Sequence, residues 1–305
     1  MSGEYYLTED VTLDSAWSIK GTGGKQVRFV LCLNGYSIRL KDGVNNHVIN
    51  VGKGGTLALC DCDGSGKNNG IITGSTNASG VYINKAGAFV MYGGSISGND
   101  TGVKNNDLFQ MYGGSITGND CGVENLSGTF TMYDGSITGN RNTKYPYGKG
   151  GGVCVEGGAF DMHGGSITGN SNDSGAGGVI NSGNIKLYGG TITGNSSAAG
   201  IGAVQTQSGS TVTLGGRSNI TDNTSGSEST ACNLYLADGV LITVDDSRDL
   251  FFRGKAGISA YNQETLTDYD KILTISRNAL SPNTSPDSYF EADHADYETC
   301  RDGNG

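Results

Sequence analysis

A nonapeptide, MYGGSITGN in its commonest form, recurs through the middle of this chain. Copies begin at Met91, Met111, Met132, Met162 and Leu187, and a degenerate copy begins at Leu214. Self-similarity at this period indicates a solenoid, in which each repeat forms one coil and buries its apolar side only against neighbouring coils. The motif therefore predicts a stack of coils rather than a globular fold.

The composition agrees with a solenoid built from strands and tight turns. The chain has 305 residues, of which 53 are glycine and 3 are proline, and this much glycine disfavours helices. Hydrophobic residues make up 35% of the chain. That fraction is low for a globular domain, but it suffices for the thin apolar column of a solenoid. We expect an all-β fold.

Each repeat contains three short strands: a Gly-Val strand, an apolar-x-apolar strand and the Ser-Ile-Thr strand. Three strands in each repeat are typical of a three-sided parallel β-helix, here of about nine coils. Residues 1–30 are expected to form an N-terminal cap, residues 31–246 the repeats, and residues 247–305 a C-terminal coil and cap. The coils are aligned on one apolar position, namely Leu33, Leu59, Met91, Met111, Met132, Met162, Leu187, Leu214 and Ile242.

Alternation along the strands predicts which side chains form the core. The Phe and Met of each Phe-x-Met strand should point inward and face the Ile of the Ser-Ile-Thr strand. The Asn that ends each motif should form a ladder at one corner, where stacked amides satisfy the backbone of the turns. The ladder positions are Asn99, Asn119, Asn140, Asn170, Asn195 and Asn223.

The residue after each Met alternates to the solvent side and forms a second column. Because parallel strands lie about 4.8 Å apart, this column should be an aromatic strip of roughly 20 Å. Aromatic rings suit the apolar faces of sugars, although stacked tyrosines also stabilise parallel strands without any ligand. The strip consists of Tyr92, Tyr112, Tyr133, His163 and Tyr188.

Unequal repeat spacing places insertions at one corner of the coil. The longest runs from Arg141 to Gly151 and contains Tyr145 and Tyr147. Loops on the edge of a rigid scaffold often carry recognition. We therefore add Tyr145 and Tyr147 to the predicted ligand-binding residues.

Charge limits the possible partners. The formal net charge is -10, so neither a nucleic acid nor an anionic membrane surface is an expected partner. No stretch is apolar enough to span a bilayer, and the opening MSGEYYL lacks the features of a signal peptide. The chain is therefore either cytosolic or part of a longer secreted protein, and its low charge and its wealth of small polar residues favour the second.

Several stretches resemble the right-handed β-helix regions of large cell-surface proteins from gut Firmicutes, which share the pectate-lyase-like superfold. They are YYLTEDVTLDSAW, LCLNGYSIRL, LALCDCDGSGKNNGIITG and the MYGGSITGN coils. The resemblance covers nearly the whole chain, and it implies a right-handed β-helix at an extracellular bacterial surface. It implies no particular activity, because the superfold hosts lyases, glycoside hydrolases and adhesins alike.

No catalytic motif accompanies the repeat, so the sequence favours a role without catalysis. A glycosidase would need two carboxylates roughly 5 to 9.5 Å apart on adjacent coils. The best candidates are Glu156, Asp161 and His163, with Asp134 one coil away. Two of these replace a regular residue of the repeat, since Asp134 stands for a Gly and His163 for a Tyr.

Neither a cofactor nor a metal ion is expected. The seven cysteines are scattered, and their pattern supports neither a disulfide framework nor a zinc site. The run from Asp61 to Gly66 resembles the opening of a calcium loop, but Ile72 stands where a closing Glu belongs. A turn rich in Asp and Gly explains this run.

The sequence thus predicts an extracellular binding or adhesion module that recognises a glycan or a host surface glycoprotein. It should be a monomer within a longer chain. Two alternatives remain: a carbohydrate-active enzyme, either a lyase or a glycoside hydrolase, and a passive spacer about 40 Å long.

Overall fold

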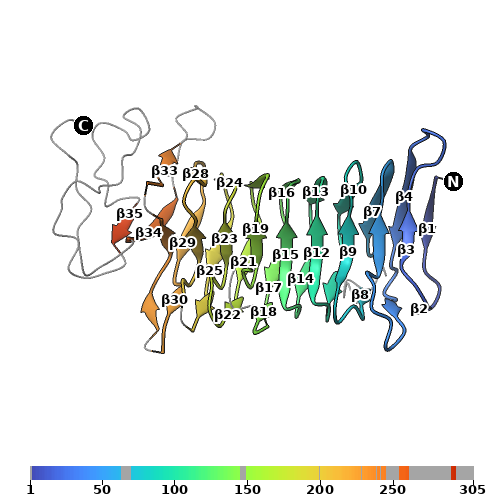
Figure 1. Cartoon of the computed structure of the whole chain (residues 1–305), viewed down its shortest axis with the longest axis horizontal. Coiled ribbons are helices and arrows are strands. Elements are labelled where there is room, and N and C mark those ends of the chain that lie inside the picture. Colours follow the sequence, from blue (N-terminus) through green and yellow to red (C-terminus); the bar gives the residue numbers. More distant parts are fainter. Residues whose placement is uncertain are drawn as a thin grey trace.

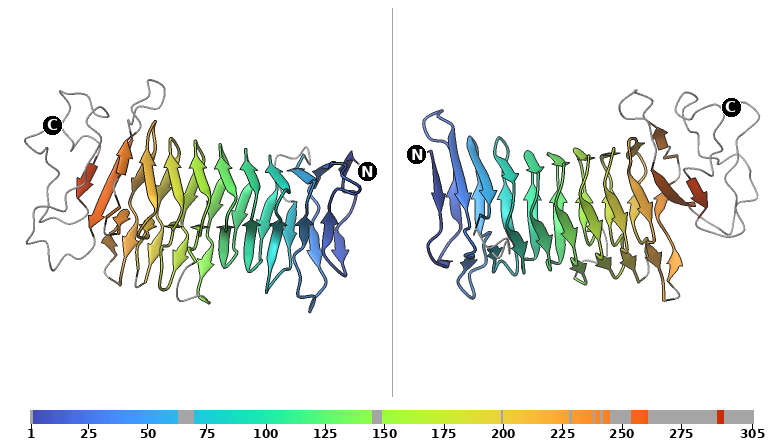
Figure 2. Two further views of the ribbon diagram at one scale, coloured as in Figure 1. Left: turned by 45° about the horizontal axis from the view of Figure 1, so that its top comes forward. Right: turned by 180° about the vertical axis from the view of Figure 1, so that it is seen from behind.

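The chain folds into a right-handed parallel β-helix whose coils stack in a straight row (Figure 1). The two further views in Figure 2 show the same straight stack, with the N-terminus at one end. This computed structural model describes residues 2–62, 70–144, 149–198, 200–227, 229–237, 239–240, 242–244, 254–260 and 290–292. Helices are absent from these ranges, so none there is long and apolar enough to cross a membrane.

Each coil contributes one strand to each of three faces. Face 1 is a 10-stranded sheet of β1 (Gly3–Tyr6), β4 (Val27–Cys32), β7 (Gly55–Cys60), β10 (Ala88–Met91), β13 (Leu108–Met111), β16 (Thr129–Met132), β20 (Ala159–Met162), β24 (Asn184–Leu187), β28 (Thr211–Leu214) and β33 (Ile242–Val244). Face 2 contains β2 (Val11–Leu13), β5 (Ile38–Leu40), β8 (Ile71–Thr73), β11 (Ser95–Ser97), β14 (Ser115–Thr117), β17 (Ser136–Thr138), β21 (Ser166–Thr168), β25 (Thr191–Thr193) and β29 (Asn219–Thr221). Face 3 contains β3 (Trp17–Ile19), β6 (Ile49–Val51), β9 (Ser79–Ile83), β12 (Thr101–Asn105), β15 (Cys121–Asn125), β19 (Val153–Val155), β23 (Val179–Asn181), β27 (Val204–Thr206) and β32 (Leu234–Leu236).

Two additional groups of strands complete the fold. At the C-terminal end, β34 (Lys255–Ala260) pairs with both β29 and β32, which joins faces 2 and 3, and β35 (Phe290–Ala292) continues from it. A 5-stranded sheet lies at the corner where the insertions leave the coil. It consists of β18 (Arg141–Asn142), β22 (Ser171–Asn172), β26 (Ser196–Ser197), β30 (Thr224–Ser225) and β31 (Thr230–Ala231). Most of the segment 247–305, expected as a C-terminal coil and cap, lies outside the described residues.

The predicted alignment of the coils holds in the middle and is wrong at both ends. Leu59 pairs with Leu31 rather than Leu33, and Leu214 pairs with Val244 rather than Ile242. The terminal coils lack the motif, and a shift of two residues keeps the same side of a strand inward. At the N-terminus, β1, β2 and β3 pair in parallel with the next coil, so the segment expected as a cap forms a coil itself.

The glycines of the motif are required by the backbone at two positions. The Gly before each Ser-Ile-Thr strand has a positive φ, for example 82° at Gly94 and 85° at Gly114, and so does the Gly after it, for example 63° at Gly118. Side chains other than glycine rarely adopt this region. The first Gly of the Gly-Gly pair is not among the positive-φ residues, and there Asp134 replaces it.

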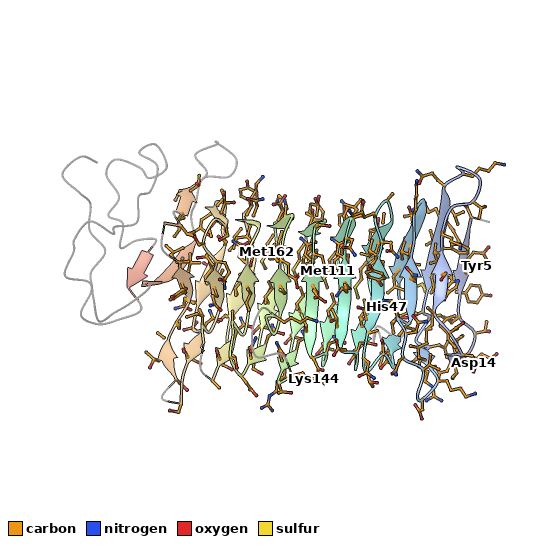
Figure 3. The ribbon with its side chains drawn as sticks, in the orientation of Figure 1. Tyr5, Asp14, His47, Met111, Lys144 and Met162 are labelled. Carbon is orange, nitrogen blue, oxygen red and sulfur yellow. A yellow bond between two sulfur atoms is a disulfide. The ribbon has the colours of Figure 1, made fainter. Side chains whose placement is uncertain are left out.

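The predicted core is confirmed. The Phe, Met and Ile columns of the central coils are almost fully buried. The phenylalanine rings stack in register, with centroids 4.6 to 5.2 Å apart along Phe89, Phe109, Phe130 and Phe160. In Figure 3 the labelled Met111 and Met162 lie within the body of the stack.

The predicted asparagine ladder is also confirmed. Each amide bonds to the next coil: Nδ2 of Asn119 donates to Oδ1 of Asn140 (3.0 Å), and Nδ2 of Asn140 donates to Oδ1 of Asn170 (2.9 Å). The same Oδ1 atom of Asn140 accepts the backbone N–H of Asn119 (3.1 Å). The ladder therefore satisfies polar groups that the turns bury.

Candidate functional site

The aromatic strip lies on face 1, directly after β10, β13, β16, β20 and β24. Its rings stack in sequence, with centroids 4.5 to 5.3 Å apart. Tyr92, Tyr112 and Tyr133 are 53%, 40% and 39% exposed. The structure therefore brings all five predicted strip residues into one continuous column that solvent reaches.

Stacking determines which parts of the rings a ligand can reach. Neighbouring rings from Tyr92 to His163 lie within 17° of parallel, so the faces of the inner rings are covered by other rings. The sequence led us to expect sugars on ring faces, but the inner part of the strip presents ring edges and hydroxyl groups. Tyr92 is the first residue of the strip. On the preceding coil, the residue at the equivalent register position is Cys60.

The neighbouring rings affect the Tyr112 hydroxyl group. Desolvation, followed by the effects of Tyr133 and Tyr92, raises the pKa of the Tyr112 phenol. A protonated phenol both donates and accepts hydrogen bonds. The tyrosine hydroxyl groups of the strip therefore form a row of hydrogen-bond donors and acceptors on an apolar base.

A polar column lies beside the strip on the same face. In register it runs through Gln110, Thr131, Asp161 and Lys186. Oδ1 of Asp161 is buried without a hydrogen-bond partner. Face 1 therefore offers hydroxyl, amide and charged groups next to the aromatic rings.

The structure distributes the four predicted catalytic residues over different surroundings. His163 is part of the aromatic strip, stacked on Tyr133 and tilted by 36° relative to Tyr188. Asp161 belongs to the polar column, and Oδ1 of Asp134 accepts the neighbouring N–H of Gly135 (2.7 Å).

The fourth candidate, Glu156, lies in a charged cluster that the sequence did not predict. Glu156 is close enough to Glu124 of β15 to be affected by its charge, and Glu124 is only 2% exposed. Oε2 of Glu124 lies 3.1 Å from Nζ of Lys104 and 3.3 Å from Nζ of Lys149. Glu156 is the residue directly after β19, and Lys149 belongs to the insertion. Because the members of the cluster come from different positions of the repeat, the repeat pattern does not predict it.

The surroundings of Glu156 in this cluster disfavour its charged form. Burial, followed by the nearby charge of Glu124, raises the pKa of Glu156. Glu124 has two ammonium partners, and a buried carboxylate needs such compensation. Glu124 is only 2% exposed, so a polymer in solvent cannot reach both carboxylates of this pair.

Lysines attach both described ends of the insertion to the solenoid. Nζ of Lys144 forms ion pairs with Asp120 and with Asp100 (3.5 Å), and Lys149 pairs with Glu124. Figure 3 shows Lys144 at the edge of the stack. Tyr145 and Tyr147, predicted to bind ligand, lie outside the described residues.

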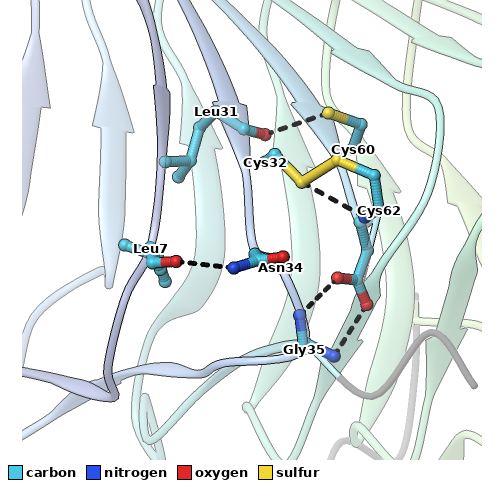
Figure 4. Close-up of a disulfide and its surroundings, with 9 residues drawn as sticks. Leu7, Leu31, Cys32, Asn34, Gly35, Cys60 and Cys62 are labelled. Carbon is cyan, nitrogen blue, oxygen red and sulfur yellow. Dashed lines mark hydrogen bonds between the residues drawn. A yellow bond between two sulfur atoms is a disulfide. The ribbon is translucent and has the colours of Figure 1, made fainter. Parts of the chain in front are cut away.

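The sequence analysis did not predict the disulfide between Cys32 and Cys62 (Figure 4). Coil stacking brings the two cysteines together across 30 residues, and no local spacing signals such a pairing. Cys60 lies beside them, and the three sulfur atoms are within 4.8 Å of one another. Two of these sulfurs are bonded to each other, which leaves a single thiol to offer a metal ion.

The nearby aspartate has a structural role. Oδ1 and Oδ2 of Asp61 accept the backbone N–H groups of Gly35 (2.7 Å) and Gly70 (2.8 Å). These bonds support the interpretation of this segment as a turn, while residues 63–66 of the calcium-like run lie outside the described residues.

No family model, no curated protein and no solved structure matches the chain.

Proposed function

We propose that the chain is an extracellular binding or adhesion module of a bacterial cell-surface protein, and that it recognises neutral glycans or a host glycoprotein through face 1. The observation that carries this proposal is the aromatic strip, a continuous row of solvent-accessible rings held in register by five coils. Solvent-facing rings of this number are a feature of ligand-binding surfaces.

The mode of recognition follows from how the rings are stacked. The strip offers hydroxyl groups at the strand spacing of about 4.8 Å, beside a polar column. A linear glycan lying along the solenoid would exchange hydrogen bonds with these groups and lay its apolar edges on the ring edges. A sugar would stack on a ring face at Tyr92, which is 53% exposed and ends the strip.

The net charge of -10 supports neutral sugars over polyanionic ones, which the overall field of the protein would repel. An enzymatic role has weaker support. Glu156, whose pKa is raised, lies beside the buried Glu124, which a polymer cannot reach, and the other three candidates lie on face 1, away from this cluster.

A glycan array tests the proposal. We expect selective retention of the wild-type protein on neutral glycans, with little dependence on salt. The double variant Tyr112→Phe and Tyr133→Phe keeps the stacked rings and removes two hydroxyl groups, so it should lose most of this retention. Tyr36→Phe is the matched control, because Tyr36 is an exposed tyrosine (37%) outside the strip.

Three results would contradict the proposal. Retention that the double variant leaves unchanged would move the binding site away from the strip. A complete lack of retention on glycans and on host glycoproteins would favour the spacer. Release of sugar products from any polymer would instead favour the enzyme.

A further inference from the structure

Three cysteines converge near the N-terminal end of face 1, in an arrangement that the proposed function does not use. Cys32 ends β4 and Cys60 ends β7, and these two residues are register partners. Cys62 follows two residues later. The sulfur atoms of all three lie within 4.8 Å of one another, and the disulfide joins Cys32 to Cys62 with a Cα–Cα distance of 6.2 Å.

Cys60 can reach the same partner as Cys62. Register neighbours on parallel strands are about 4.8 Å apart, and disulfides span Cα–Cα distances of about 4.4 to 6.8 Å. Figure 4 shows the sulfur of Cys60 beside the disulfide, where its thiol donates to the carbonyl oxygen of Leu31 (3.6 Å). Both Cys32–Cys62 and Cys32–Cys60 therefore satisfy the geometric requirement.

We propose that Cys32, Cys60 and Cys62 form a thiol–disulfide exchange site in which the bond moves between these two pairings. The thiolate of Cys60 attacks Sγ of Cys32, so the Cys32–Cys60 bond forms as the Cys32–Cys62 bond breaks. Cys60 gives its proton to water, and the departing Cys62 thiolate takes one up. One disulfide and one thiol are present before and after, so no oxidant or reductant is consumed.

The three cysteines differ in exposure, so the exchange changes which thiol solvent can reach. Cys32 is buried (7% exposed), Cys60 is partly buried and Cys62 is exposed. Exchange therefore converts a sheltered thiol into an accessible one. The freed Cys62 can attack a disulfide on another molecule and form a mixed disulfide, and the other half of that disulfide leaves as a thiol. Partners with accessible disulfides are the ligand class that this site would take.

Two local contacts favour the attack on Cys32. The backbone N–H of Cys62 donates to Sγ of Cys32 (3.1 Å), which withdraws electron density from the sulfur that is attacked. The hydrogen bonds that the carboxylate of Asp61 accepts from the backbone N–H groups of Gly35 and Gly70 fix the turn that carries Cys60 and Cys62. The site does not depend on the proposed glycan binding, although it lies next to Tyr92.

The rate of exchange should depend on pH. Burial, followed by the carboxylates of Asp61 and Glu4, raises the pKa of the Cys60 thiol. The phenols of Tyr92 and Tyr6 are the register neighbours of Cys60 and Cys32 on the adjoining strands. Only the thiolate attacks, so the exchange should be slow at pH 7 and accelerate about tenfold for each pH unit below that pKa.

Time-resolved alkylation tests the proposal. Full-length protein carrying Cys300→Ser, free of external thiols, would be held at pH 7 or 9, quenched with acid and labelled with N-ethylmaleimide under denaturing conditions. Cleavage before Asp61 separates Cys60 from Cys62 for mass spectrometry. We expect the label to appear on both residues, with a share on Cys62 that grows faster at pH 9 and at a rate independent of protein concentration.

Two variants make the outcome decisive. Cys60→Ser should keep Cys62 unlabelled at both pH values. Cys62→Ser, at an exposed position that should not disturb folding, should form the Cys32–Cys60 disulfide in a glutathione disulfide buffer. Label confined to Cys60 in the parent protein at pH 9, or free Cys32 and Cys60 thiols in Cys62→Ser, would overturn the proposal.

Discussion

The phenylalanine column inside the solenoid and the aromatic strip outside it have nearly the same geometry. Ring centroids are 4.6 to 5.2 Å apart in the inner column and 4.5 to 5.3 Å apart in the strip. Their burial differs: Phe130 is fully buried, whereas Tyr133 is 39% exposed. Stacking by itself therefore follows from parallel strands in register.

The comparison separates two roles that sequence repetition alone does not distinguish. An inner ring is retained because its loss leaves a cavity in the core. An outer ring contributes little packing, so its repetition over five coils needs another explanation, either ring stacking or a ligand. The following predictions use matched positions of the same coils to separate these explanations.

The largest effect is expected for Phe130→Ala. It removes a ring packed between Phe109 and Phe160 and should lower the free energy of unfolding by about 3–5 kcal/mol. Tyr133→Ala on the same coil should cost only about 1 kcal/mol, the contribution of exposed aromatic pairs. Chemical denaturation measures both. Equal losses would show that the strip is as structural as the core.

A similar contrast should hold for polar residues. Asn140→Ala removes a fully buried amide that bonds to four neighbouring residues, so it should cost at least about 2 kcal/mol, because each orphaned buried group costs about 1–3 kcal/mol. Asn184→Ala on the exposed side of β24 should cost less than about 1 kcal/mol. Denaturation of both variants checks this, and a smaller loss for Asn140→Ala would contradict the role of the ladder.

A third prediction concerns the charge of Glu156 on face 3. Because the pKa of Glu156 is raised in the folded state, the folded chain holds this proton more tightly than the unfolded chain does. The stability from this group is complete below the ordinary value of 4.5 and is lost as pH rises through the raised value. Glu156→Gln should therefore gain stability over the wild type between pH 4 and pH 7. Denaturation curves of both proteins across this pH range measure the gain in the free energy of unfolding. A difference between the variant and the wild type that stays constant with pH would rule out the raised pKa of Glu156.

How much the sequence could predict depends on whether a feature repeats. The fold, the core and the asparagine ladder follow from the motif, because each position recurs on successive coils. The disulfide of Cys32 and Cys62 depends on register in coils that lack the motif. The charged cluster around Glu124 depends on Glu156, which follows β19 in one coil only, and on Lys149, which belongs to an insertion. Neither residue recurs at its position in the other coils. The strip was predicted by position, but the orientation of its rings depends on side-chain packing that alternation does not specify.

The smallest effect on stability, and the one most informative about function, is expected for Tyr133→Phe. The change keeps the ring between Tyr112 and His163 and removes only an exposed hydroxyl group, so the free energy of unfolding should change by less than about 0.5 kcal/mol. If the strip binds glycans through its hydroxyl row, retention on the best glycan should nevertheless fall about tenfold, the effect of losing one good hydrogen bond of about 1.4 kcal/mol. Tyr36→Phe should change neither quantity. A variant that unfolds like the wild type and binds like it would leave the strip with only the packing role that it shares with the phenylalanine column.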